Sequence, residues 1–432
     1  GTVKKRLLVA VLSVSLLTAV FAGCADKDAS GQTDTRTAGV ETKQADEGEQ
    51  LESGKVALRV WVEEANIPNL QKMIDSFKQK YAGQADFDIT IEVSGDADTR
   101  ANVLGDIHNA ADIFSMPDDQ LYSLIAGGAL SPVANQDEVK TANLTDAVDA
   151  ASYNGTVYAY PYTADNGYFL YYNKEYFSES DVQTLDRILE VAAENEKKFS
   201  MEFNSGWYLY SFYGNTGLDF GINADGVTNY CTWNATEGSI KGVDVAQALI
   251  DIATHPGFIA QPDASFVEGI QDGTCIAGIS GVWNAVAVQE AWGKSYGACK
   301  LPTYTCKGQQ IQMSSFKGYK MFGVNSYSDH LAWAHKLADW ITNEENQILR
   351  FQERSQGPAN IVAASSDEVG KVPAIAAVIE QSQYGVLQRV GNSYWTACTG
   401  FADAIAAGNP DNVSLQDLVD RLVSGITASV VQ

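Results

Sequence analysis

The feature of this sequence that most constrains its fold is an alternation of strand-like and helix-like hydrophobic patterns. Residues 56–62 are mostly apolar and β-branched, which predicts a strand. Apolar residues recur at helical spacing over 70–81, and apolar and polar residues alternate over 88–93 as in a second strand. The pattern then continues as a helix over 100–109, a strand over 112–115 and a helix over 118–126. Strands that alternate with helices in this way predict an α/β fold built on a parallel sheet.

The first 54 residues differ from the rest of the chain. Lys4, Lys5 and Arg6 precede a charge-free apolar run over 7–22, which is shorter than the ~20 residues of a transmembrane helix and ends in small residues before Cys24. We therefore interpret residues 1–23 as an export signal. Residues 24–54 are rich in polar residues and contain no aromatic one, so they bury too little surface to form a core, and we expect a flexible tether.

The remaining stretch of about 380 residues is longer than one hydrophobic core usually holds, so we expect two lobes. The whole chain carries a formal net charge of −25. The predicted signal contains three basic residues and no acidic one, so the mature chain would carry −28. A chain this acidic is a poor partner for nucleic acid and is repelled by an anionic membrane surface.

Cysteine and histidine usage predicts neither a metal site nor a bound cofactor. Five cysteines follow Cys24, an odd number, so at least one stays unpaired within a monomer: Cys231, Cys275, Cys299, Cys306 and Cys398. Cys299 and Cys306 could close a small loop, but their spacing alone does not decide the pairing. The sequence has no CxxC motif, and its four histidines are scattered, which is unlike a zinc site.

Two tyrosine-rich motifs carry a family resemblance. Residues 153–161, YNGTVYAYP, resemble the YNG-x-x-x-AYP signature of extracellular solute-binding proteins of the maltose and maltodextrin class. Residues 168–174, YFLYYNK, resemble the YNK element of the same family. Further pieces follow in the family's order, at 111–114 with 127–130, at 281–283, at 301–303 and at 394–395.

The resemblance implies a fold and a role. The fold is two α/β lobes with the ligand between them, the N-terminal lobe comprising residues 55–163 and 323–370 and the C-terminal lobe residues 164–322 and 371–432. The implied role is to bind a carbohydrate, with malto-oligosaccharide as the first choice, and to deliver it to the permease of an ABC transporter. We expect a monomer, without a cofactor and without enzymatic activity.

The segment before Cys24 is similar to the lipobox of bacterial lipoproteins, which implies that Cys24 becomes the lipidated N-terminus. Phe21 stands where the lipobox has an aliphatic residue. On this interpretation the protein is extracytoplasmic and anchored by lipid to the cell membrane. The alternative is a plain secretory signal with an incidental cysteine.

Sugars offer a C–H face, which aromatic rings cover, and a rim of hydroxyls, which polar side chains bind. Trp283 and Trp395 both stand where a strand or loop opens, at positions where the family carries stacking aromatics, and we predict that they are sugar platforms. Trp207 and Tyr208 are further candidates. Any single tryptophan can instead be core, as we expect for Trp333 and Trp340, which share one helix face.

Polar candidates come from strand ends and from the family pattern. Asp119 matches a sugar-binding carboxylate of the family, and Asp165 lies one residue from another. Glu63, Glu64 and Asn66 follow the first predicted strand, where an ordinary solvated turn is the alternative.

Three residues close to Asp119 in the sequence are interpreted differently. We interpret Asp118 as a helix cap. Met116 and Gln120 replace a tryptophan and an arginine of the family pattern, which leaves the identity of the sugar open.

Two other classes of function compete with an importer's binding protein. A glycoside hydrolase would need two carboxylates about 5 to 9.5 Å apart, and no local sequence assigns such roles to Asp119 and Asp165. Residues 278–281 fall short of a GxSxG elbow, and neither a phosphate-binding loop nor HExxH occurs. A surface glycan-binding protein without a transport partner is the other alternative.

Overall fold

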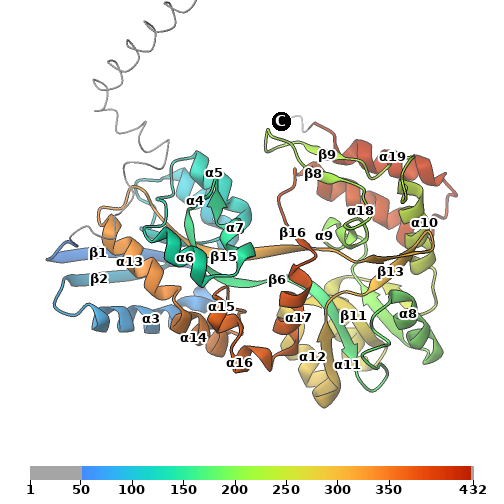
Figure 1. Ribbon diagram of the computed structural model, residues 1–432, viewed down its shortest axis with the longest axis horizontal. Helices are drawn as coiled ribbons and strands as arrows, with labels where there is room; N and C mark the ends of the chain where they lie inside the picture. The colour runs from blue at the N-terminus through green and yellow to red at the C-terminus, as the bar shows by residue number, and fades with distance from the viewer. Residues whose placement is uncertain (1–50, 430–432) are drawn as a thin grey trace, which may run out of the picture.

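The computed structural model describes residues 51–429, which form two halves joined by long strands (Figure 1). The predicted signal, Cys24 and nearly all of the predicted tether lie outside the described residues. Within residues 51–429, no helix combines the length and the apolar character needed to cross a membrane.

The first half begins with the predicted β-α-β unit. Strand β1 (Lys55–Val62) pairs in parallel with β2 (Asp86–Val93) on one side and with β3 (Ile113–Pro117) on the other. Helix α3 (Ile67–Lys80) connects the first two strands and buries its apolar stripe, which includes Met73 and Phe77. The periodicity in the sequence therefore placed these elements in the observed order.

Two long strands run from one half into the other and join their sheets. The first part of β6 (Ala159–Asn173) pairs antiparallel with β15 (Ser315–Val324), which also pairs antiparallel with β3. The second part of β6 pairs antiparallel with β11 (Cys275–Gly281) and β12 (Tyr296–Cys299). The hydrogen-bonded order is β10-β7-β11-β6-β15-β3-β1-β2, with β12 on β6 and β16 (Gly385–Leu387) on β15. A third segment, β16, thus returns beside the crossing strands.

The other elements cover these sheets. In the first half they are α4 (Thr99–Gly105), η3 (Asp118–Gln120), α5 (Leu121–Ala126), α6 (Gln136–Ala142), α7 (Thr145–Ala150), β4 (Ser152–Tyr153), β5 (Thr156–Val157), α13 (Leu331–Ile341), α14 (Glu344–Arg354), α15 (Ile361–Ala364) and α16 (Asp367–Gly370), with η1 (Glu64–Asn66) and η2 (Asp96–Asp98) after strand ends. In the second half they are α8 (Leu185–Glu194), β7 (Lys198–Met201), α9 (Gly206–Leu209), η4 (Tyr210–Phe212), β8 (Phe220–Ile222), β9 (Asn229–Cys231), α10 (Gly242–Ala253), β10 (Phe258–Ala260), α11 (Asp263–Asp272), η5 (Val282–Asn284), α12 (Ala285–Trp292), η6 (Gly293–Ser295), β13 (Thr303–Cys306), β14 (Gln309–Gln312), α17 (Pro373–Ser382), α18 (Ser393–Ala406) and α19 (Leu415–Ile426).

Each half has its own hydrophobic core. One core draws on residues from Val56 to Tyr162 and from Tyr319 to Ala359. The largest core of the other half draws on residues from Tyr168 to Phe316 and from Tyr394 to Ile426. The chain therefore enters each core twice. The boundaries that we predict at residues 163, 323 and 370 stay a prediction.

Several local expectations can be compared with the structure. Trp333 is fully buried against Phe87, and the Trp340 Nε1–H donates to the Met73 carbonyl oxygen at 3.0 Å, so both belong to one packed helix face. The helix predicted over 100–109 ends at Gly105. All five cysteines among the described residues have free thiols, Cys299 and Cys306 included.

The interpretation of Asp118 as a helix cap is wrong. Its side chain is buried, and its Oδ1 accepts the backbone N–H of Tyr319 on β15 at 2.8 Å. The residue that occupies the cap position of η3 is Pro117, and no side chain caps that helix. Asp118 therefore connects η3 to a crossing strand, which local sequence could not reveal.

Candidate functional site

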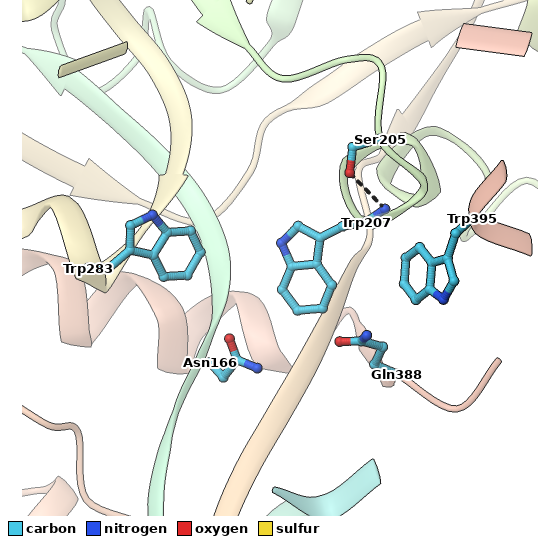
Figure 2. A pocket seen from close by; sticks show the side chains of 6 residues that line it. All are labelled: Asn166, Ser205, Trp207, Trp283, Gln388 and Trp395. Carbon is cyan, nitrogen blue, oxygen red and sulfur yellow. Dashed lines mark hydrogen bonds between the residues drawn. The ribbon is translucent and has the colours of Figure 1, made fainter. Parts of the chain in front are cut away.

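A cavity of about 540 Å³ collects side chains from widely separated segments of the chain. Its lining consists of Asn166, Ser205, Trp207, Trp283, Gln388 and Trp395. Figure 2 shows the Trp207 indole between those of Trp283 and Trp395, with Asn166 and Gln388 along one side. Three of these residues are tryptophans for which the sequence predicts sugar contact.

Trp283 projects from the end of a central strand. Strand β11 ends at Gly281, and η5 follows at once, so the indole stands at the strand's carboxyl end. The residue remains half exposed, at 50% of its full accessible area. The indole N–H donates to Asp263 Oδ2 at 2.8 Å, so one ring edge is bound while a face borders the cavity.

Trp207 and Trp395 lie near each other in space although they are far apart in the sequence. Ser205 caps the start of α9 by accepting the Trp207 backbone N–H at 3.2 Å, and Trp395 lies in the first turn of α18. Both rings pack on buried Phe316 of the crossing strand β15, with ring centroids 5.6 Å and 6.3 Å away respectively. These two platforms therefore rest on a strand that links the halves.

The polar lining consists of amides and a hydroxyl, and sequence reasoning missed all three residues. Asn166 lies in β6 where that strand pairs with Gly318 of β15. Gln388 follows β16, whose pairing with β15 is not readable from its own sequence. Ser205 precedes a predicted candidate, and its helix-capping role was the available signal. None of the described residues that line the cavity is acidic.

Other predicted contacts do not line this cavity. Tyr208 is only 3% exposed, because consecutive helical residues point about 100° apart and its neighbour Trp207 takes the cavity side. Asn66 is also buried, and its Oδ1 accepts Arg354 Nε–H at 3.0 Å. Glu63 Oε1 accepts the Asp96 backbone N–H at 3.3 Å, while Glu64 is exposed in η1.

The two predicted carboxylates do not line the cavity either. Asp119 is exposed on η3, yet the surrounding protein partly desolvates its carboxyl and raises its pKa. Asp165 is partly buried beside Asn166, and its Oδ2 accepts the Gly357 N–H at 2.8 Å. Burial raises the pKa of Asp165, and that hydrogen bond opposes the rise. The sugar-binding roles of both residues stay predictions, without a shared cavity.

Positions 116 and 120, where the sequence departs from the family pattern, point inward. Met116 is fully buried in the first half's core. Gln120 is 5% exposed, and its amide donates to the Asp96 carbonyl oxygen at 3.0 Å. These two side chains therefore support the first half instead of adding an aromatic or cationic contact to a ligand.

The chemistry of the cavity is that of recognition. Indole faces can cover the C–H face of a sugar ring, and amides both donate to and accept from hydroxyls. Among residues 51–429, no group of three or more His, Cys, Asp or Glu side chains is arranged to hold a metal ion.

Comparison with known proteins identifies the family. A family model described as bacterial extracellular solute-binding protein matches residues 72–377, more than two thirds of the chain. The chain is a bacterial extracellular solute-binding protein. This match confirms the family that the tyrosine-rich motifs predicted, and proteins of this family bind solutes.

Relatives of this solute-binding protein handle oligosaccharides. It is 27% identical over 330 residues to the galactooligosaccharide-binding protein of Bacillus subtilis (strain 168), covering 73% of this chain and 76% of the relative. It is 26% identical over 400 residues to the maltooligosaccharide ABC transporter solute-binding lipoprotein of Streptococcus pneumoniae (strain ATCC BAA-255 / R6), covering 87% of this chain and 91% of the relative.

A solved structure shares the fold. The solute-binding protein resembles the maltodextrin binding protein MalE1 from L. casei BL23 without ligand, with a TM-score of 0.73 and 22% identity over 87% of this chain and 99% of that one. The likeness confirms the predicted α/β fold of this family.

Proposed function

We propose that this solute-binding protein captures an oligosaccharide in the tryptophan-lined cavity and delivers it to the permease of an ABC transporter. The observation that carries the proposal is the convergence of Trp207, Trp283 and Trp395 on one cavity with an amide and hydroxyl rim. Three indole faces suit several sugar units better than a single small polar solute. The relatives' names support the same class of ligand.

Malto-oligosaccharide is the first choice of sugar. The maltooligosaccharide relative aligns over 87% of this chain, a longer stretch than the galactooligosaccharide relative. The buried side chains of Met116 and Gln120 leave the first half without the tryptophan and arginine of the family pattern, so galacto-oligosaccharide is the alternative sugar. The Asp119 and Asp165 carboxylates would serve as hydrogen-bond acceptors for hydroxyls and not as a catalytic pair.

In this proposal the lipid on Cys24 anchors the protein to the outer surface of the cell membrane. The protein acts as a monomer and without a cofactor. A sugar held in the cavity that also contacted the first half would favour a closed arrangement, since a ligand shifts a conformational equilibrium only by its differential affinity for the two states. The closed form would then dock onto the permease.

The binding proposal is tested by calorimetric titration with malto-oligosaccharides and galacto-oligosaccharides of two to six units. We expect binding of one series without cleavage of the sugar during prolonged incubation. Trp395→Ala and Trp283→Ala should each weaken binding at least fivefold, about 1 kcal/mol per lost stacking contact. Both variants should unfold at close to the wild-type urea concentration, because both tryptophans are partly solvent-accessible.

Trp292→Ala is the matched control. This tryptophan lies in α12 of the same half, is partly buried against another cluster and does not line the cavity. Its replacement should cost folding stability and leave affinity unchanged. Turnover of the sugar, or equal affinity in all three variants, would contradict the proposal.

A further inference from the structure

A carboxylate outside the cavity lining gathers four hydrogen-bond donors behind one of the platforms. Asp263 begins α11, and its Oδ2 accepts the Trp283 indole N–H at 2.8 Å and the Asn284 amide at 3.1 Å. Its Oδ1 accepts the Ser280 hydroxyl at 2.6 Å and the Tyr208 hydroxyl at 3.3 Å. Every one of these partners donates, as a carboxylate requires, since it only accepts.

The backbone confines the same indole from a second direction. A Cβ on Gly281 would lie 2.1 Å from Trp283 Cζ3, so the ring lies directly over this glycine. The Gly281 carbonyl oxygen is itself fixed by the Tyr171 hydroxyl at 2.7 Å. Trp283 is thus half exposed, yet it is held at its N–H and along its ring.

We propose that Asp263 is a positioning residue of the sugar site, which fixes the Trp283 indole in the orientation that presents its face to the cavity. The proposal rests on the proposed function, the binding of an oligosaccharide in this cavity. Fixing the ring before the ligand arrives removes an ordering cost from binding, because immobilising a free side chain otherwise opposes association. Tyr208, which is buried and does not line the cavity, contributes through the same carboxylate.

A purely structural role for Asp263 is the competing explanation, because a carboxylate in the first turn of a helix also stabilises that helix. The two roles differ in how they depend on the indole N–H. A phenylalanine at position 283 keeps an aromatic face but has no N–H for Asp263 to bind. Asp263 should therefore matter for sugar affinity only while Trp283 is present.

Fluorine NMR tests the geometry without any sugar. The protein is labelled with 5-fluorotryptophan, and Trp283→Phe identifies the resonance of Trp283. Asp263→Ala should shift or broaden this resonance. Asp263→Asn should largely restore it, since the Ser280 and Tyr208 hydroxyls can reverse and leave the amide oxygen for the indole N–H. A Trp283 resonance that Asp263→Ala leaves in place overturns the proposal.

Affinity for the oligosaccharide found by titration supplies the second readout. Asp263→Ala should weaken binding about threefold to tenfold in the wild-type background, the range expected for ordering one side chain. It should have no further effect in Trp283→Phe. The control Asp417→Ala removes a first-turn carboxylate from α19 and should leave affinity unchanged.

The outcomes separate the two proposals. Equal losses of affinity in the wild-type and Trp283→Phe backgrounds mean that Asp263 acts through the fold, and the positioning role is then wrong. If the wild-type protein binds no oligosaccharide, the proposed function fails, while the fluorine spectrum still decides whether Asp263 positions the ring.

Discussion

The carboxyl group of Asp118 is enclosed between η3 and β15, and only one of its oxygens has a hydrogen-bond partner. Oδ1 accepts the Tyr319 N–H, while Oδ2 is buried without one. Desolvation raises the pKa of Asp118 to about 7, and the hydrogen bond from the Tyr319 N–H and the positive charge of Arg389 oppose the rise only in part. The protein thus buries a group that prefers to be protonated.

This pKa predicts a pH dependence of stability. Between the ordinary aspartate pKa near 4 and the folded value of about 7, the folded protein holds a proton that the unfolded chain releases. Its contribution to stability is therefore complete below about pH 4 and is lost as the pH rises through 7. Asp118→Asn should raise the free energy of unfolding at pH 8 by on the order of 1 kcal/mol or more, with little change at pH 4.

Urea unfolding at pH 4 and pH 8 measures this difference. Asp411→Asn, at an exposed loop position, provides the control and should shift stability little at either pH. A loss of stability in Asp118→Asn at pH 8 would show that the charged carboxylate is well accommodated.

Prediction of single residues from the sequence succeeded where the position of a residue along its own strand or helix decides where its side chain lies. Trp283 and Trp395 follow a strand or loop opening, and the structure places both at the cavity. Prediction was incomplete where a lining residue is positioned by a segment that is distant in the sequence. Gln388 reaches the cavity because β16 pairs with β15. In this pairing Gly385 lies opposite Ser315, which is 70 residues earlier in the chain, and no local sequence pattern encodes such a pairing.

At the scale of elements, the tyrosine-rich region illustrates a limit of periodicity. The motifs at 153–161 and 168–174 are separate in the sequence, whereas one strand, β6, runs from Ala159 in the first motif to Asn173 in the second. Thr163, Asp165 and Asn166 interrupt the hydrophobic pattern, but backbone pairing to β15 keeps this stretch extended. A strand shared by two sheets needs no continuous apolar face where it passes between their cores.

The contact between α9 and α18 sets the spacing of two platforms. A Cβ at Gly206 would lie 2.7 Å from a Tyr394 ring carbon and 3.1 Å from Trp395 Cε3, so only glycine permits this approach. The Tyr394 hydroxyl also donates to the Gly206 carbonyl oxygen at 2.5 Å. A side chain at 206 therefore requires α9 or the Tyr394 and Trp395 rings to shift.

Gly206→Ala should therefore destabilise the protein by about 1–3 kcal/mol, the usual cost of overpacking, and should weaken oligosaccharide binding. Thermal unfolding and titration measure the two effects. Gly400→Ala is the matched control on α18, where a Cβ meets nothing within 4 Å. Because alanine favours an exposed helix, the control should gain up to about 1 kcal/mol of stability and keep its affinity. Unchanged affinity in Gly206→Ala would mean that this contact does not set the platforms.

At the scale of the whole molecule, chain length predicts two lobes, and among residues 51–429 each half has its own large hydrophobic core. The charge is a property of the same scale. The predicted mature net charge of −28 opposes electrostatic attraction to an anionic membrane surface. The proposed lipid anchor at Cys24 would then account for any attachment to the membrane.

If Cys24 carries the lipid as proposed, Cys24→Ser should release the protein from the membrane into the surrounding fluid, because a hydroxyl cannot carry the thioether-linked lipid. Membrane sedimentation followed by immunoblotting measures the partition. Washing wild-type membranes with about 1 M salt should release nothing, since salt weakens charge attraction and not burial of acyl chains. Cys231→Ser, which removes a free thiol within the folded domain, should leave the partition unchanged. Retention of Cys24→Ser on membranes would show that this protein is held by a partner or by an uncleaved signal segment.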